Sequence, residues 1–363
     1  MVREYADHKD GLWDIAVTSG SGSVRTRSGL VGSACADMRA VIWDVEIGRI
    51  LAQYTGHSGS VNSIRFMPGG GGEVLLTGSG DRTAHLWKLP AEHQRQISSE
   101  EELEQSDEDT LQSQTQGLLP SGPGGTSGSF GMGSGPGATV SNPLLVLRGH
   151  SGVVVAVDAF SQTSFDEGKI LTASWDRTAN LYDGNTGDII TSLLGHDGEL
   201  TYVRVHPNQR LAVTASKDTT FRLWDFRESI HSVSVFQGHT DAVNSAVFTQ
   251  EDKVVSGSED RTVKVWDLRN MRSPVAAIQL DSAVNRLAVN GSGVIAIPHD
   301  NRHIRLYDTQ GNRLARLPRN DRTGHRRMVT AAVWAEDPEM TPNLFTSAFD
   351  RRICGWKVTF PKD

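Results

Sequence analysis

The chain of 363 residues has few of the features that mark secreted or membrane-spanning proteins. It contains two cysteines, Cys35 and Cys354. This scarcity argues for a reducing compartment and against a disulfide framework. No stretch approaches the roughly 18 consecutive apolar residues of a membrane-spanning helix, and the N-terminal MVREYADHKD lacks the apolar segment of a signal peptide. We therefore expect a soluble protein that is neither inserted into a membrane nor exported by a signal peptide.

The sequence also lacks the motifs of common catalytic and cofactor sites. No Cys/His cluster has metal-binding spacing, and the glycine run at residues 67–73 has neither the spacing nor the following helix of a phosphate-binding loop. His, Ser and Asp do recur, but six sets at one period indicate a structural role, because a catalytic triad is needed once. We expect no catalytic residues, no metal, no cofactor and therefore no enzyme.

The sequence is built instead from a repeated unit, which is clearest from Gly238 to Asp267. Three stretches of alternating apolar and polar residues, separated by turns, predict three short strands in this unit. Each copy has an opening His, a turn Asp, and a Trp or Tyr six residues after that Asp. The turn aspartates are Asp37, Asp81, Asp176, Asp218, Asp260 and Asp350. A seventh copy at residues 281–308 has Asn301 and Tyr307 in these places and no opening His.

Units that open with Gly-His and close with Trp-Asp resemble WD40 repeats, and seven of them resemble a closed β-propeller with four antiparallel strands per blade. The resemblance implies an all-β fold, with residues 1–363 forming a single seven-bladed WD40 β-propeller. The last inner strand, at residues 356–360, lacks an outer partner. We expect residues 2–6 to pair with this last blade, because closing the ring removes an exposed sheet edge.

Four residue types in each unit predict a buried hydrogen-bond chain. An indole donates, a hydroxyl both accepts and donates, and an imidazole joins that hydroxyl to a carboxylate. Every member is needed, since an orphaned buried polar group costs about 1 to 3 kcal/mol. In three repeats the predicted members are His57, Thr77, Asp81 and Trp87; His196, Thr214, Asp218 and Trp224; and His239, Ser256, Asp260 and Trp266.

One spacing is much longer than the others and predicts an insertion at residues 90–142. Asp81 and Asp176 lie 95 positions apart, whereas the other neighbouring turn residues lie 41 to 49 apart. The insertion has an acidic run at 98–109 and a Gly/Ser/Pro-rich tract at 117–142, so we expect it to be disordered. An acid stands three residues after each of three serines, the pattern of an acidophilic kinase site; the alternative is a solvated linker. These candidate phosphorylation sites are Ser98, Ser99 and Ser106.

The loops with the His residues and the turns with the Asp residues should lie at one end of the strands, which we call the top face. Its aromatic residues are candidate interface anchors, and its split into an acidic and a basic side would orient a protein partner. The alternative is a mixed solvated rim with aromatics folded over neighbouring loops. The predicted partner-binding residues are Trp175, Lys217, Glu199, Glu259, Asp300, Arg319, Arg322, Arg326, Met328 and Phe349.

These features predict a monomeric, non-catalytic scaffold or adaptor for protein partners. Nucleic acid is a poorer candidate, because the formal net charge is −7 and the basic residues lack interleaved aromatics. Stretches from SWDRTANLYD (174–183) to GHRRMV (324–329) are similar to one particular member of the WD40 family. That resemblance implies partnership with phosphofurin acidic cluster sorting proteins and a cytoplasmic and nuclear location.

A competing function rests on two Trp-Asp-x-Arg sequences, which end at Arg227 and Arg269. They resemble the box that substrate receptors of cullin-4 ubiquitin ligases use to dock on an adaptor. The structural alternative is an arginine that satisfies the turn at the end of a strand. Short boxes match by chance, so both readings stay open at this stage.

Overall fold

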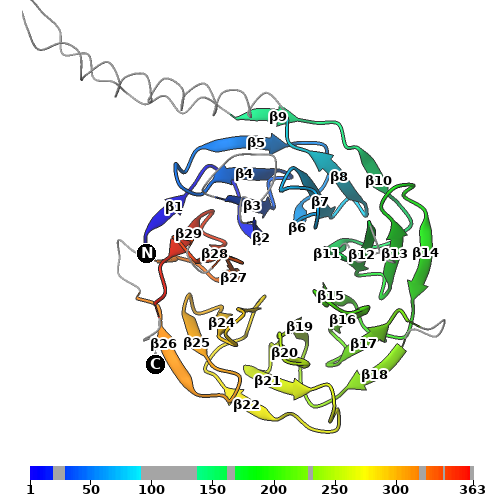
Figure 1. Cartoon of the computed structure of the whole chain (residues 1–363), viewed down its shortest axis with the longest axis vertical. Coiled ribbons are helices and arrows are strands. Elements are labelled where there is room, and N and C mark those ends of the chain that lie inside the picture. The colour runs from blue at the N-terminus through cyan, green and yellow to red at the C-terminus, as the bar shows by residue number, and fades with distance from the viewer. Residues whose placement is uncertain are drawn as a thin grey trace, which may run out of the picture.

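The computed structural model describes residues 1–18, 29–90, 137–161, 168–227, 232–318, 324–337 and 340–359. In these residues seven antiparallel sheets surround a central axis, as Figure 1 shows in a view down that axis. The chain is thus an all-β, seven-bladed propeller, and each sheet is called a blade below. Within the same residues no helix has the length and apolar character needed to cross a membrane.

Each blade has four strands, listed here from the inner to the outer strand, and blade 1 has a fifth strand that is described below. Blade 1 contains β2 Leu12–Thr18, β3 Leu30–Cys35, β4 Ala40–Asp44 and β5 Ile50–Tyr54, and blade 2 contains β6 Val61–Phe66, β7 Val74–Ser79, β8 Ala84–Lys88 and β10 Leu145–Leu147. Blade 3 contains β11 Val154–Ala159, β12 Lys169–Ser174, β13 Ala179–Asp183 and β14 Ile189–Leu193, and blade 4 contains β15 Leu200–Val205, β16 Leu211–Ser216, β17 Phe221–Asp225 and β18 Ser232–Phe236. Blade 5 contains β19 Val243–Phe248, β20 Lys253–Ser258, β21 Thr262–Asp267 and β22 Ala276–Gln279, and blade 6 contains β23 Ala288–Val289, β24 Ile295–Pro298, β25 Ile304–Tyr307 and β26 Arg313–Arg316. Blade 7 contains β27 Val329–Trp334, β28 Leu344–Ala348, β29 Ile353–Trp356 and β1 Arg3–Tyr5.

The core lies between neighbouring blades. A middle strand packs against an adjacent sheet on both faces, so its residues are buried in succession: Ile170, Leu171 and Ala173 of β12 have no exposed surface. The outer strand β14 of the same blade leaves Ile189 43% and Ile190 49% exposed. Burial therefore decreases from the inside of the ring to its rim, as expected for sheets that are covered only by their neighbours.

The ring closes through the N-terminal strand. β1 pairs antiparallel with β29, with Arg3 opposite Gly355 and Tyr5 opposite Ile353. In Figure 1 the blue β1 lies beside the red β29. Tyr5 is 2% exposed and its hydroxyl donates to the carbonyl of Val45 in blade 1 at 2.9 Å. The two ends of the chain thus share blade 7, and a buried tyrosine fastens that blade to the next.

Part of the insertion is ordered, which corrects the prediction that residues 90–142 are disordered throughout. Ala138–Val140 form β9, which pairs parallel to β5 as a fifth strand of blade 1 (Figure 1). The N–H of Thr55 also donates to the carbonyl of Val140 at 2.9 Å. The prediction from composition was wrong here because the open edge of β5 offers backbone hydrogen-bond partners, and these do not depend on apolar side chains. The expectation for residues 91–136 lies outside the described residues.

Every blade has the same turn between its second and third strands. The residue after the turn Asp or Asn has a left-handed backbone, with φ between 65° and 71°; these residues are Met38, Arg82, Arg177, Thr219, Arg261, Arg302 and Arg351. In blade 5 the Asp260 carboxylate supports the turn by accepting the N–H of Thr262 at 2.9 Å. The turn exposes the side chain at the left-handed position, so each blade presents one residue there to solvent or to a partner.

Candidate functional site

One backbone hydrogen bond, repeated in all seven blades, places the turns and the His-bearing loops at the same end. The residue before the turn Asp or Asn donates its N–H to the loop that precedes the inner strand. In blade 3 Trp175 donates to Val153 at 3.0 Å, and in blade 4 Lys217 donates to Glu199 at 2.9 Å. The equivalent bonds of the other blades measure 2.8 to 3.4 Å. This end of the propeller is the top face, on which the predicted partner-binding residues were placed.

The buried hydrogen-bond chain is complete in blades 4 and 5. In blade 5 the Trp266 indole donates to Ser256 Oγ at 2.9 Å, and His239 bonds that hydroxyl and Asp260 Oδ2 at 2.8 Å each. Burial opposes the charge on Asp260, but the Thr262 hydroxyl, the Thr240 N–H and His239 together outweigh it and lower the pKa of the carboxyl to about 2. In blade 4 the corresponding members are His196, Thr214, Asp218 and Trp224, at 2.7 to 2.8 Å.

Blade 2 departs from the predicted chain at Trp87. His57 bonds Thr77 Oγ1 at 2.9 Å and Asp81 Oδ2 at 2.8 Å, but the buried indole N–H of Trp87 has no hydrogen-bond partner among the described residues. Its ring instead stacks on Tyr54, with centroids 4.7 Å apart. The prediction for Trp87 was wrong because it considered hydrogen bonding alone, whereas here a tyrosine of blade 1 aligns the indole by stacking.

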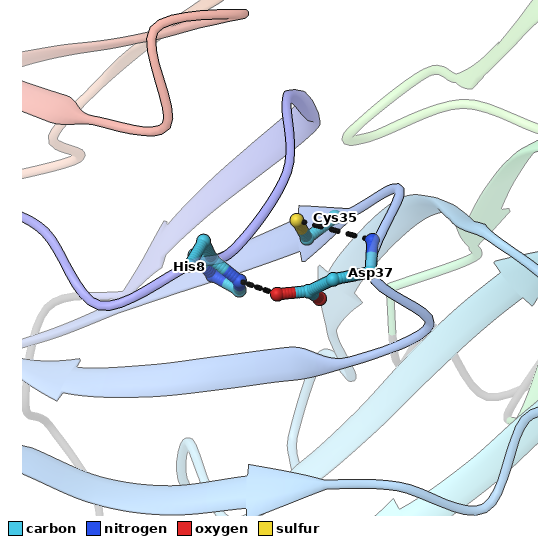
Figure 2. Close-up of side chains that lie close together, drawn as sticks. All are labelled: His8, Cys35 and Asp37. Carbon is cyan, nitrogen blue, oxygen red and sulfur yellow. Dashed lines mark hydrogen bonds and ion pairs between the residues drawn. The ribbon is translucent and has the colours of Figure 1, made fainter.

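Figure 2 shows one of two groups of potential metal ligands in the described residues, formed by His8, Cys35 and Asp37. Both ring nitrogens of His8 are engaged, with Ser33 Oγ at 2.7 Å and Asp37 Oδ2 at 3.2 Å. Cys35 takes the place of the serine of other blades, since its Sγ accepts the N–H of Asp37 at 3.4 Å. Burial raises the pKa of the thiol to about 12, which opposes the thiolate that a metal needs. The group completes the hydrogen-bond chain of blade 1.

The second group is His57, Asp81 and His85 in blade 2. His57 already bonds Thr77 and Asp81, as described above. His85 bonds the Tyr54 hydroxyl through Nδ1 at 2.7 Å and Thr83 Oγ1 through Nε2 at 3.0 Å. The ring nitrogens of both histidines are thus used by hydrogen bonds within blade 2 and to Tyr54 of blade 1, so the arrangement is better explained by structure than by metal binding.

Three predicted top-face residues meet in what we call the aromatic patch: Trp175, Lys217 and Glu199. The Lys217 ammonium lies 5.3 Å from the Trp175 ring centroid and 2.6 Å from Glu199 Oε2. Trp175 is 46% exposed, and the side chains of Lys217 and Glu199 are 50% and 42% exposed. A cation–π contact and an ion pair therefore orient a large indole that remains accessible to a partner.

Phe349 is less exposed than an anchor would be. It is half-buried and packs edge-to-face on Trp13, with ring centroids 4.7 Å apart. Gly11 makes room for this ring, because a Cβ there would lie 2.5 Å from the phenyl. Trp13 itself is 37% exposed at the start of the inner strand β2. The pair is thus folded over a neighbouring loop, as the alternative interpretation held, and leaves Trp13 as its accessible member.

Phe349 also lines a cavity of about 430 Å³ between blades 7 and 1, which we call the basic cavity. Its cationic lining residues are Lys9, Arg326, Arg327, Arg351 and Arg352, and its acidic ones are Asp10 and Asp350. The Asp350 carboxylate is turned into blade 7, where it bonds His325 at 3.1 Å and the N–H of Arg326 at 2.8 Å. The basic side predicted from the sequence therefore includes a concave site.

The other predicted top-face residues do not join either site. Glu259 and Asp300 are exposed on blades 5 and 6, where Asp300 accepts a bond from Asn285 at 2.8 Å. Met328 is half-buried and its carbonyl accepts the N–H of Phe349 at 3.1 Å. Outside the described residues lie Arg319, Arg322, Ser98, Ser99 and Ser106.

The two Trp-Asp-x-Arg arginines lie at the end of the strands opposite the top face. Arg227 bonds the Asp225 carboxylate through Nε at 2.9 and 2.8 Å, and Arg269 pairs with Asp252 at 2.8 Å. Their side chains are 65% and 79% exposed. Both arginines thus satisfy local carboxylates, which agrees with the structural reading of the box, and both stay accessible.

Sequence reasoning missed three contributors to the top face: Trp13, Arg351 and Arg352. Trp13 occupies a strand position at which the repeat pattern expects an ordinary residue. Arg351 and Arg352 follow the turn Asp directly, and a comparison of the residues after the turn Asp in the different blades could have found them. In blades 2 to 5 the second of these positions is a threonine; in blade 7 it is an arginine.

Comparison with known proteins agrees with the fold. The family model described as "WD domain, G-beta repeat" matches residues 48–88, 141–183, 187–225 and 230–267. Together with seven blades, six of which have the His–Asp pair, this defines the chain as a WD-repeat β-propeller, a class that supports a role as a protein-interaction scaffold.

The relatives narrow the class to one family. Over 99% of its length the chain is 51% identical to WD repeat-containing protein 37 of Mus musculus and of Xenopus laevis, and 50% identical to that of Homo sapiens. The alignments cover 69% of each relative. The chain belongs to the WD repeat-containing protein 37 family.

Proposed function

We propose that the chain is a non-catalytic adaptor that binds a phosphofurin acidic cluster sorting protein through its top face, in the cytoplasm and nucleus. The observation that carries the proposal is the aromatic patch, in which Trp175 is 46% exposed while Lys217 and Glu199 fix its orientation. A large, pre-oriented aromatic is the usual anchor of a protein interface. The partner's identity is an inference from the family resemblance.

The chemistry of the blades supports an adaptor over an enzyme. A histidine that serves as a base needs an accessible substrate proton. The six opening histidines of the described blades are buried and bonded to a hydroxyl and an Asp within their own blades, as His239 is to Ser256 and Asp260. The two buried free thiols, Cys35 and Cys354, are consistent with the proposed reducing compartments.

The proposal is tested by measuring binding of a purified phosphofurin acidic cluster sorting protein to the immobilised chain. The Trp175→Ala/Lys217→Ala variant should bind at least about tenfold more weakly, the loss that one interface hot spot causes. Arg269→Ala, on the opposite face, should stay within about twofold of the wild type. Circular dichroism checks that each variant is folded. Equal binding by the wild type and both variants would show that the aromatic patch is not part of the interface. No binding by any of the three would show that the sorting protein is not a partner of this chain.

A second candidate function is a substrate receptor of a cullin-4 ubiquitin ligase. The exposure of Arg227 and Arg269 on the face away from the patch favours it, because an adaptor could dock there while the top face stays open. Co-purification of the damaged-DNA-binding adaptor from cells, lost in Arg227→Ala/Arg269→Ala, would support this function. If the wild-type chain co-purifies no adaptor and the double variant still binds the sorting protein, the result would support the scaffold function alone.

A further inference from the structure

We infer that the basic cavity is a binding site for a phosphorylated side chain in an acidic segment of a protein partner. The inference deepens the proposed function, since the cavity lies on the same top face. Its walls carry five cationic residues, Lys9, Arg326, Arg327, Arg351 and Arg352, against the two acids Asp10 and Asp350. The volume of about 430 Å³ is within the range of about 300 to 1,000 Å³ that ligand sites occupy.

Most of these cations are not used by the fold. Arg352 pairs with Glu4 at 2.8 Å. In the described part of the chain, the side chains of Lys9, Arg326, Arg327 and Arg351 have no hydrogen bond or ion pair. Among the described residues neither cavity acid forms an ion pair with these four: Asp350 is bonded within blade 7, and Asp10 Oδ1 accepts the N–H of Gly11 at 2.7 Å. The four neighbouring cationic side chains are therefore available to bind an anion that a partner supplies.

The other blades provide an internal comparison. In blade 3 the two positions after the His are Ser151 and Gly152, and the two after the turn Asp are Arg177 and Thr178. The corresponding residues of blade 7 are Arg326, Arg327, Arg351 and Arg352. Each blade thus supplies the same surface positions, and only in blade 7 are all four arginine.

One of these arginines replaces a residue that the fold uses. Thr178 donates its hydroxyl to Asp176 Oδ1 at 2.7 Å, and Thr262 donates to Asp260 Oδ1 at 2.7 Å. Arg352 occupies this position in blade 7 and directs its guanidinium to Glu4 instead. The blade gives up a part-buried hydrogen bond of the turn and gains a charge at the cavity, a departure from the local rule that is expected at functional sites.

The side chains favour phosphate over other anions. Guanidinium groups bind phosphate through two parallel N–H···O bonds, and a phosphoserine carries about −1.5 to −2 charges with three acceptor oxygens. The half-buried Phe349 on the cavity wall, and Trp13 packed against it, add apolar surface for the residues that flank the phosphate. Such a mixture suits a peptide better than a free anion.

The test measures binding of a fluorescein-labelled peptide, Gly-Leu-Asp-Asp-Ser-Asp-Glu-Glu-Gly, with its serine phosphorylated or free, to the full chain by fluorescence anisotropy. The phosphopeptide should bind at least about tenfold more tightly than the free peptide. Arg326→Glu and Arg351→Glu should each remove most of this difference. Arg177→Glu is the matched control, because Arg177 is exposed at the same left-handed turn position of blade 3 with φ 71°, against 69° for Arg351. It should change binding by less than about twofold.

Two outcomes would overturn the inference: equal binding of both peptides, or an equal loss in Arg177→Glu and Arg351→Glu. Binding of phosphatidylserine vesicles that requires Arg351, with no peptide binding, would assign the cavity to membranes instead. Failure of this inference is distinguishable from failure of the proposed function. If the sorting protein binds through the aromatic patch while neither peptide binds, the adaptor stands without phosphate recognition. If the phosphopeptide binds and the sorting protein does not, the basic cavity is a phosphate site and the proposed partner is wrong.

Discussion

The carboxylate of Asp14 and the guanidinium of Arg286 meet inside the ring, with Oδ2 and Nη1 3.2 Å apart. Asp14 belongs to blade 1, whereas Arg286 precedes β23 of blade 6. The same oxygen accepts a bond from Arg65 of blade 2 at 2.9 Å. Arg286 reaches still further and donates to the carbonyls of Asn62 and Val155 at 2.8 Å each. One buried carboxylate thus compensates the buried Arg65 and the part-buried Arg286 and joins blades that are not neighbours in the ring.

Substituting Asp14→Asn should therefore destabilise the propeller strongly. The change preserves the side-chain shape but leaves the charges of Arg65 and Arg286 uncompensated, which costs about 3 to 5 kcal/mol for a buried pair. The shift of the urea-unfolding midpoint measures this cost. Asp197→Asn, at an exposed loop position, should cost less than about 0.5 kcal/mol. An unchanged midpoint for Asp14→Asn would show that the central cluster adds nothing to stability.

Two tryptophans at the same repeat position should respond differently to loss of the indole N–H. Trp266 donates to Ser256 at 2.9 Å, whereas Trp87 has no partner for its N–H. Trp→Phe removes similar volume at both sites and leaves a ring that can still pack on its aromatic neighbours, so the hydrogen bond is the main difference between them. Trp266→Phe should be more destabilising than Trp87→Phe by about 1 to 3 kcal/mol in urea unfolding. Equal costs would mean that packing alone decides both.

The repeat pattern predicted the hydrogen-bond chain within blades 4 and 5, but it did not predict the unpaired indole of Trp87 in the described part of blade 2. His239, Ser256, Asp260 and Trp266 recur at fixed spacing because each strand pair imposes the same register on them. The same spacing predicted seven blades even where blade 6 has Asn301 in place of the Asp. These features are local, so that one blade's sequence contains all the information that they require.

Contacts between blades were not predictable in this way. Asp14, Arg65 and Arg286 stand at positions that the repeat does not define, and their meeting depends on how three inner strands face the axis. The basic cavity likewise joins residues of the first 10 positions to Arg326 and Arg351. β9 was missed because a strand that adds to an edge is held by its backbone, which composition does not report.

Disrupting β9 should expose the edge of β5. Replacing Ala138–Val140 by Gly-Pro-Gly removes the parallel partner of Ala52, Gln53 and Tyr54, because a proline cannot donate and glycines disfavour a strand. Hydrogen exchange measured by mass spectrometry should become faster in residues 50–55. The outer strand β14 of blade 3 has no such fifth strand in the described sheets, and its exchange should not change. Unchanged exchange at β5 would show that β9 contributes no protection.

Blade 6 contains a histidine whose burial predicts a dependence of stability on pH. His299 has no exposed surface, and neither ring nitrogen makes a hydrogen bond of normal geometry with the part of the chain that the structure describes. Burial lowers the pKa of His299 to about 4, and the positive charge of Arg305 adds to the effect. The carbonyls of Ser282 and Ala283 and the charge of Asp281 oppose the shift without cancelling it. The ring is therefore neutral in the folded protein at any ordinary pH.

An unfolded chain takes up a proton at this histidine near pH 6.5, whereas the folded chain does so near pH 4. Between these values the unfolded state binds more protons, so the free energy of unfolding is highest above about pH 6.5 and falls as the pH decreases, by roughly 3 kcal/mol for this residue. His299→Leu substitutes an apolar group for the orphaned ring and should change stability little at pH 7. Its urea midpoint should then fall less steeply than that of the wild type between about pH 7 and pH 5, with the remaining slope due to groups such as His85, whose pKa burial also lowers to about 4. Parallel pH profiles for the two proteins would show that His299 is not held neutral by its burial.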